Sequence, residues 1–184
     1  MSFLKEDLNR YYNVVFHRFE WNEPSFIVVI LYRMARGIRL MPKWLFPLKL
    51  VLNILIVPFY AFFSILLGIS IPRGAEIGPG LRIFHFGTIV INPKAIIGKN
   101  FSIHHGCTIG VKSSYFDQAI IGDNVTMGAG SKILGNVKIG NNVTIGANAV
   151  VLTDVPDNSV AVGIPAKIFP KKNKEYDINK GPFN

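Results

Sequence analysis

Cysteine is nearly absent from this chain of 184 residues, which contains Cys107 alone. A single cysteine cannot form an internal disulfide, which argues against a disulfide-stapled extracellular domain. The first residues also lack the charged, apolar and small-residue order of a secretory signal. We therefore expect a cytoplasmic protein, either free or held at the cytoplasmic face of the inner membrane. Cys107 is predicted to be a buried small residue and not a nucleophile.

Acidic residues are also scarce: 11 Asp and Glu stand against 20 Lys and Arg, for a formal net charge of +9. The basic residues are scattered and are not interleaved with aromatic residues, so a nucleic-acid partner is not expected. An anionic small molecule or an anionic membrane surface fits this charge better. The hydrophobic content of 49% and the mean hydropathy of +0.33 are high for a soluble protein.

Charge is missing altogether from residues 50–71. By length, this segment is a candidate membrane helix. Asn53 and Pro58 would interrupt a regular span, and Lys43 and Lys49 precede it. Three alternatives stay open: a helix at the membrane surface or re-entrant, a helix buried against the rest of the protein, and a transmembrane helix. The basic flank favours contact with a cytoplasmic membrane surface.

The segment before this stretch is predicted to be helical. One helix is expected over residues 26–39, with Pro24 in its first turn. Arg33, Arg36 and Arg39 recur at three-residue spacing and predict a basic face. That face is either solvated or in contact with phosphate groups.

The main pattern in the chain is an aliphatic residue at every sixth position. The positions are Ile71, Ile77, Ile83, Ile89, Ile97, Ile103, Ile109, Ile121, Met127, Ile133, Ile139, Ile145 and Val151. Seven of them are followed directly by Gly. A period of six fits neither a helix nor an ordinary strand and is typical of a hexapeptide β-helix. A β-sandwich would show alternation by two instead.

Each six-residue unit is predicted to form one side of a triangular coil. The aliphatic residue points inward and stacks on its counterparts in neighbouring coils, since one coil cannot bury its own face. The period slips by two residues between Ile89 and Ile97, and one position is skipped before Ile121. Residues 111–118 lack the repeat and are expected to form an extruded loop, where function often resides.

Together with residues 163–167 (Gly-Ile-Pro-Ala-Lys), the repeat resembles the hexapeptide-repeat acyltransferases. Within them it is most similar to the serine acetyltransferase branch. The matching segments are residues 77–90, 102–110 and 127–136, and the resemblance covers about residues 70–170. The repeat is highly specific for the fold and less specific for the activity, because one scaffold serves many acceptors.

The resemblance implies an all-β, left-handed parallel β-helix preceded by a helical, strongly apolar extension. We place the helical region at residues 1–69, the β-helix at 70–170 and a tail at 171–184. The resemblance also implies homotrimers with an active site between neighbouring β-helices. Acetyl-CoA, as co-substrate, would lie in the groove beside the coils. No metal is expected.

A histidine at the position of His85 is the general base in that family. The sequence around it, Phe84-His85-Phe86-Gly87, follows the inward Ile83 and lets His85 point outward. Histidine suits this role because its ordinary pKa lies near neutrality, so it can take the proton of an acceptor hydroxyl. The alternative for His85 is a surface residue on a coil corner.

The predicted acceptor pocket consists of His104, His105, Asp117 and Asn92, although a structural role for the two histidines is an open alternative. The predicted cofactor-binding residues are Gly128, Ala129, Gly146, Ala147 and Lys167. The small residues would let the pantetheine arm lie close to the coils, and the lysine would meet a phosphate. Small residues at these corners are also needed by the fold itself.

This chain departs from the serine acetyltransferase pattern in three places. Ser70 stands where the family has an orienting Asp, Phe84 replaces the Asp before the histidine, and residues 115–118 lack the loop Arg-His pair. We therefore predict transfer of an acetyl group to a sugar hydroxyl in surface-polysaccharide synthesis, on a free or lipid-linked acceptor. The alternatives are L-serine as acceptor and a non-catalytic trimeric scaffold at the membrane. A γ-type carbonic anhydrase is not expected, because His104 and His105 are adjacent and no His-x4-His pair exists.

Overall fold

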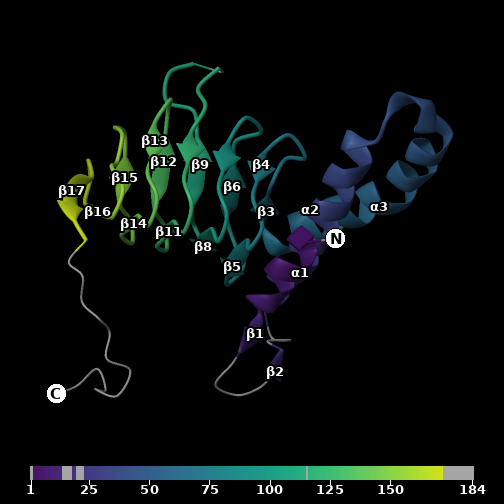
Figure 1. The fold of residues 1–184 in the computed structure, drawn as a ribbon, viewed down its shortest axis with the longest axis horizontal. Helices are drawn as coiled ribbons and strands as arrows, with labels where there is room; N and C mark the ends of the chain where they lie inside the picture. The colour runs from purple at the N-terminus through teal and green to yellow at the C-terminus, as the bar shows by residue number, and fades with distance from the viewer. Residues whose placement is uncertain (1, 14–17, 20–22, 115, 172–184) are drawn as a thin grey trace.

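The fold is a parallel β-solenoid preceded by helices, as seen in a computed structural model (Figure 1). The structure describes residues 2–13, 18–19, 23–114 and 116–171. The predicted tail at 171–184 therefore lies almost wholly outside the described residues. The solenoid has about five turns, which confirms the predicted β-helix with an N-terminal helical extension.

Three parallel sheets form the sides of the solenoid, and each of the first four coils contributes one strand to each sheet, while the last coil joins the first sheet only through the bridge between Ile139 and Val155. The first sheet contains β4 (Glu76–Ile77), β7 (Ile96–Ile97), β10 (Ile120–Ile121) and β13 (Lys138–Ile139). The second contains β5 (Arg82–Phe84), β8 (Ser102–His104), β11 (Thr126–Met127), β14 (Thr144–Ile145) and β16 (Ser159–Val162), with β17 (Lys167–Pro170) antiparallel at its end. The third contains β3 (Ile69–Ser70), β6 (Ile89–Ile91), β9 (Thr108–Gly110), β12 (Lys132–Leu134) and β15 (Val150–Val151).

The core is the column of six-spaced aliphatic residues. All of them point inward and are at most 3% exposed, and successive coils pair them in register, as Ile83 with Ile103. Cys107 is fully buried among them, in agreement with its predicted structural role. Close stacking explains the glycines at the corners: a Cβ on Gly78 would lie 2.7 Å from the carbonyl carbon of Gly98 in the next coil.

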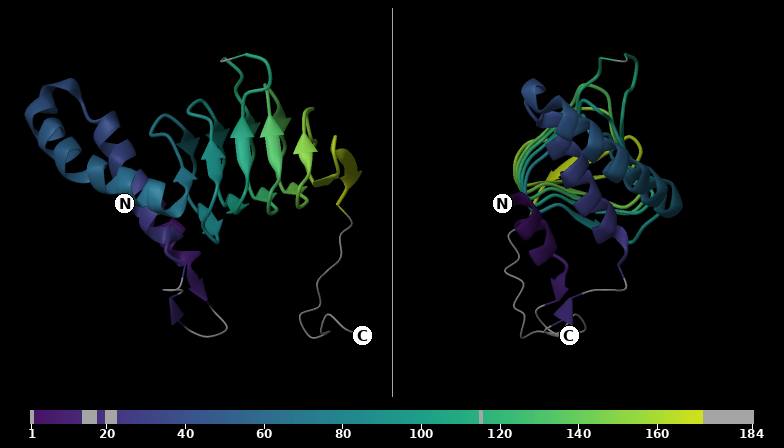
Figure 2. Two further views of the ribbon diagram at one scale, coloured as in Figure 1. Left: turned by 180° about the vertical axis from the view of Figure 1, so that it is seen from behind. Right: turned by 90° about the vertical axis from the view of Figure 1, so that its right-hand side faces the viewer.

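The N-terminal region comprises α1 (Ser2–Asn9), β1 (Tyr12–Asn13), β2 (Arg18–Phe19), α2 (Ser25–Leu40), η1 (Lys43–Leu45) and α3 (Phe46–Leu67). It is thus helical apart from the antiparallel pair β1–β2. The apolar segment predicted at 50–71 is helical from Phe46, and Pro58 lies inside the helix. Gly68 ends α3 in the left-handed conformation, with φ 63°, and the chain passes directly into β3. Figure 2 shows α2 and α3 projecting together from the β3 end of the solenoid.

Side chains from these helices satisfy the open edge of the first coil, which has no preceding coil to pair with. Arg33 donates to the carbonyl oxygens of Ile77 and Gly78 at 2.6 Å and pairs with the buried Asp7 at 2.7 Å. Arg36 also donates to carbonyl oxygens of this coil. Both predicted environments for these two arginines, solvent and phosphate, are therefore wrong. Their side chains cap an end that a repeat fold must protect.

Candidate active site

His85 lies on a strained turn between β5 and β6. Its φ is 61°, and Thr88 three residues later has φ 51°. Five asparagines are the other described non-glycine residues with positive φ, and asparagine tolerates that conformation well. A β-branched residue such as Thr88 does not, so the turn is held by its surroundings. The imidazole of His85 is 64% exposed, as predicted for an outward-pointing side chain.

Glu23 holds this histidine from outside the solenoid. Its Oε1 lies 3.0 Å from Nδ1 of His85, and its Oε2 accepts the backbone N–H of His85 at 3.1 Å. The Glu23 side chain is only 17% exposed. A carboxylate on Nδ1 leaves Nε2 free to accept a proton, and it stabilises the imidazolium that forms. Glu23 is thus placed where it can orient the imidazole, a task that the resemblance assigned to the position of Ser70.

His104 and His105 lie in the next coil, beside His85. The rings of His85 and His105 are 6.0 Å apart, and the ring of His104 stacks on Phe84 at 4.7 Å. Burial, with the neighbouring His85, His105 and Arg82 charges, lowers the pKa of His104 below its ordinary value. His104 is therefore a neutral, stacked ring at neutral pH. The structure brings the three predicted histidines together.

The predicted cofactor residues continue the same corner of the solenoid through the following coils. Backbone hydrogen bonds join Gly106 to Gly87 at 2.9 Å, Gly130 to His105 at 2.9 Å, and Asn148 to Ala129 at 2.8 Å. We call the stacked segments 85–88, 104–106, 128–130 and 146–148 the histidine corner. Parallel strands lie about 4.8 Å apart, so His85 and Gly146 are separated by about 14 Å along it.

Small residues at this corner could serve either the stacking of the coils or the binding of a ligand. For the glycines, the structure supports stacking. A Cβ on Gly128 would lie 2.8 Å from the Ala147 nitrogen, and one on Gly146 would lie 2.6 Å from Val162 Cγ1. The stacking of coils therefore requires these glycines whether or not a ligand binds. Ala129 is half-buried and Ala147 is exposed, so the corner carries nothing larger than a methyl group there. Lys167 is exposed at the start of β17.

Asn92 and Asp117 lie at a different corner, between the third and first sheets. Asn92 follows β6, and the loop that contains Asp117 leaves the solenoid between β9 and β10. The Asn92 side chain donates to the Asp117 carbonyl at 3.4 Å. We call residues 92–95 and 111–118 the loop corner. Within one chain, the structure does not bring these two residues to the histidines, so they cannot share one pocket with His85 there.

The carboxylate of Asp117 organises its own loop. Its Oδ2 accepts the backbone N–H groups of Lys112 at 2.8 Å, Ser113 at 3.0 Å and Ser114 at 3.3 Å. These hydrogen bonds lower the pKa of Asp117, those from Lys112 and Ser113 most, although the side chain is exposed to solvent. A structural role in the loop accounts for all of these contacts.

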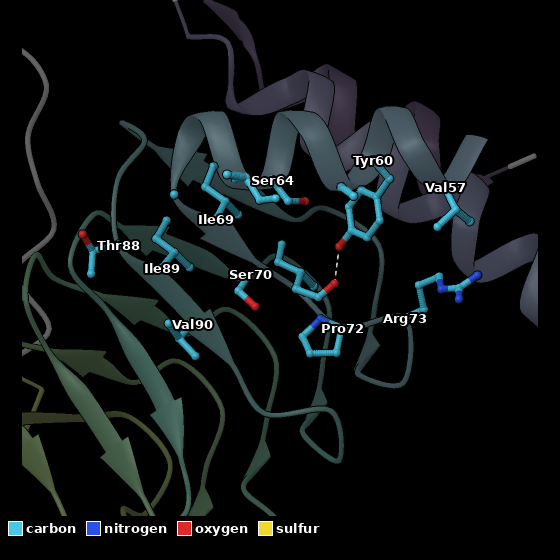
Figure 3. A pocket seen from close by; sticks show the side chains of 14 residues that line it. Val57, Tyr60, Ser64, Ile69, Ser70, Pro72, Arg73, Thr88, Ile89 and Val90 are labelled. Carbon is cyan, nitrogen blue, oxygen red and sulfur yellow. Dashed lines mark hydrogen bonds between the residues drawn. The ribbon is translucent and has the colours of Figure 1, made fainter. Parts of the chain in front are cut away.

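A pocket of about 650 Å³ lies between α3 and the first coils, next to the histidine corner (Figure 3). Ser70 and Thr88 contribute hydroxyl groups to it, and Arg73 contributes a cation. Its walls are otherwise mainly apolar, and no Asp or Glu lines it. Thr88 belongs to the turn of His85, but His85 itself does not line the pocket.

Among the described residues, no group of three or more His, Cys, Asp or Glu could hold a metal ion. The sequence also did not reveal Glu23, which is 62 residues from His85 in the chain and lies outside the repeat. The segment Glu23-Pro24-Ser25 carried only the signal of a helix start. No pattern in a single sequence links it to a corner of the solenoid.

Comparison with known proteins shows which family and which relatives this chain is similar to. Residues 118–153 match the family described as "Bacterial transferase hexapeptide (six repeats)". Serine acetyltransferase 1, chloroplastic, of Arabidopsis thaliana is 42% identical over 116 residues, which are 62% of this chain and 37% of the plant enzyme. The chain thus spans little more than a third of that relative.

Two solved structures extend the likeness over the helices. The serine acetyltransferase of Neisseria gonorrhoeae in complex with serine has a TM-score of 0.71 and 32% identity, covering 90% of this chain and 67% of that one. The serine acetyltransferase of Brucella abortus in complex with coenzyme A has a TM-score of 0.74 and 30% identity, covering 91% and 66%. The solenoid is left-handed, as it is in these structures.

These relatives correct the predicted acceptor. The departures at Ser70, Phe84 and the loop favoured a sugar hydroxyl, but the relatives are serine acetyltransferases, and L-serine was the stated alternative. The sugar prediction is wrong: departures at a few positions do not outweigh the likeness to serine acetyltransferases, which extends over most of the chain. Repeat, family match and structural likeness agree: the chain belongs to the hexapeptide-repeat transferases, on their serine acetyltransferase-like branch.

Proposed function

We propose that this protein is an acetyl-CoA-dependent serine O-acetyltransferase with His85 as its general base. The observation that carries the proposal is the outward imidazole of His85, held at Nδ1 by Glu23 at the head of the histidine corner. The relatives named above support L-serine as the acceptor and coenzyme A as the carrier, because solved members of the branch bind them.

The residues of the corner can perform direct transfer. Acetyl-CoA supplies the acetyl group as an activated thioester. Nε2 of His85 takes the proton of the serine hydroxyl as its oxygen bonds to the acetyl carbon. Glu23 stabilises the resulting imidazolium, which then returns the proton to the departing sulfur. No acyl-enzyme is needed, and the buried Cys107 takes no part.

The histidine corner fits a long, narrow ligand. Ala129 and Ala147 present only methyl groups, and Gly128 and Gly146 present none, so an extended pantetheine arm can lie against the coils. Lys167 is exposed at the end of the same run and can meet a phosphate group. These residues would bind and orient the carrier, and His85 would stand at its reactive end.

A homotrimer would complete the site. Asn92 and Asp117 sit at the loop corner, away from His85 of their own chain, so they can serve the acceptor pocket only from a neighbouring subunit. Outward apolar residues border that corner: Val90 is 43% exposed and Ile120 is 38% exposed. Light scattering on the purified protein is expected to give three times the chain mass of 20.5 kDa; a monomer would refute this part of the proposal.

Steady-state release of coenzyme A tests the function. Thiol release from acetyl-CoA should depend on L-serine and should be much slower with D-serine, because the acceptor must be oriented toward His85. An active protein whose turnover is indifferent to L-serine would overturn the serine assignment.

A further inference from the structure

The outward face of α3 is entirely apolar. Its exposed large residues are Phe46, Leu48, Leu50, Val51, Ile54, Leu55, Phe59, Phe62, Ile65 and Leu66, which are 47% to 82% exposed. Their spacing of three and four residues puts them on one half of the helix. Exposed positions between them are also apolar, as at Pro58 and Ala61. A soluble protein normally turns such a stripe inward.

The polar residues of α3 point the other way, toward the protein. Lys49 donates to the carbonyl of Arg39 at 2.9 Å, and Asn53 accepts from Arg73 at 2.9 Å. The hydroxyl of Tyr60 donates to the carbonyl of Ile71, as Figure 3 shows. The few polar groups of the helix thus lie on its inner side, beside the core residue Leu67 and the packed Phe63, while its outer side is apolar. Such a helix needs an apolar medium on its outer side.

Charge and aromatic residues gather at one end of this stripe. Trp44, at the tip of the α2–α3 hairpin, is 78% exposed, and Lys43 beside it is exposed as well. Tryptophan and lysine are the residues that favour the headgroup region of a bilayer. The stripe itself offers no polar side chain that could fix the register of a protein partner, whose interfaces carry about one hydrogen bond per 100–200 Å².

We propose that α3 lies on an anionic lipid bilayer, with its apolar face among the acyl chains and the hairpin tip among the headgroups. The helix of 22 residues is about 33 Å long. By length and composition, Lys43–Leu67 could cross a membrane, and only 11% of its 18-residue apolar window is buried within the chain. Its polar face nevertheless stays bonded to the first coil and α2. The helix therefore lies in the interface and does not cross it.

Flotation of the full-length protein with vesicles tests this directly. The vesicles contain phosphatidylcholine with about one-third phosphatidylglycerol, and flotation is repeated in about 0.5 M salt, where surface charge is largely screened. The test variant is Leu55→Glu with Phe59→Glu, at positions 54% and 61% exposed. The matched control is Ile168→Glu with Phe169→Glu, at exposed positions of β17 at the opposite end of the solenoid. Both variants change the net charge equally.

The wild type and the β17 control should float in both salt conditions, and the α3 variant should partition at least about tenfold more weakly. Failure of the wild type to float would overturn the proposal, as would its release by salt, which would indicate charge alone. Equal loss in both variants would overturn it too. If the wild type stays with the aqueous phase and the α3 variant shows a smaller particle mass, the stripe binds a second copy of the chain instead. Because the readout is independent of turnover, failure here leaves the acetyltransferase proposal untouched.

Discussion

Replacing Glu23 by Gln removes one negative charge from the back of the imidazole and keeps the size of the side chain. The carboxylate contacts His85 twice, at Nδ1 and at the backbone N–H, over 3.0 Å and 3.1 Å. Hydrogen bonds to charged groups contribute about 1.5–3 kcal/mol. The imidazole is 64% exposed, so solvent screening favours the lower end of this range. About 1.4 kcal/mol corresponds to a tenfold change in rate.

We therefore expect Glu23→Gln to lower kcat for serine acetylation about tenfold, and Glu23→Ala to lower it further, up to about a hundredfold. The KM for acetyl-CoA should not change, because the stacked small residues of the histidine corner do not contact Glu23. Initial rates of thiol release, measured over a range of both substrates, give the two constants separately.

Glu76→Gln is the matched control. Glu76 also lies at the helical end of the solenoid, and its carboxylate is 3.6 Å from Arg36 with a side chain 63% exposed. Exposed ion pairs contribute little, so this variant should keep the wild-type kcat. The reasoning is refuted if Glu23→Gln retains kcat within about twofold of the wild type. It is also refuted if the loss is matched by unfolding in circular dichroism, since Glu23 would then act only on the fold.

Two further predictions concern the cap and the loop. Asp7→Ala should lower the free energy of unfolding by about 3–5 kcal/mol in urea titrations, because it leaves the buried Arg33 without its carboxylate partner. An unchanged unfolding midpoint would contradict the role of this ion pair in capping the first coil. Asp117→Asn should speed hydrogen exchange at the three loop amides that its carboxylate accepts, with no change in global stability; unaltered exchange would show that the loop is held otherwise. The pKa of Asp117 is lower in the folded protein than the ordinary value of an aspartate. In the wild type, its hydrogen bonds therefore stabilise the loop fully at pH values above the ordinary pKa, and this stabilisation is lost as the pH falls through the lowered pKa.

The repeat was predictable because its physics is local and periodic. Every six-spaced aliphatic residue must point inward for coils to stack, so a single sequence shows the solenoid, its approximate limits and the loop that interrupts it. The outward direction of His85 follows in the same way from its place two residues after Ile83. Its role as base came from the resemblance and not from the period.

Contacts between the helices and the solenoid were not predictable from the pattern. Glu23 reaches His85, and Arg33 reaches Asp7 and the first coil, through tertiary packing that leaves no periodic trace. Arginines at three-residue spacing look the same in sequence whether they face water or an open strand edge. The grouping of Asn92 and Asp117 with the histidines is not formed within one chain, because these residues lie at a different corner of the solenoid; it stays a prediction for a neighbouring subunit.

The most direct test of the account is identification of the product by mass spectrometry. Purified protein is incubated with acetyl-CoA and L-serine, and the wild type is compared with His85→Ala. We expect O-acetylserine from the wild type and a loss of at least about a hundredfold in the variant, with binding of coenzyme A retained. Equal amounts of O-acetylserine from both proteins would contradict the role of His85, and its absence from the wild-type reaction would contradict the proposed function.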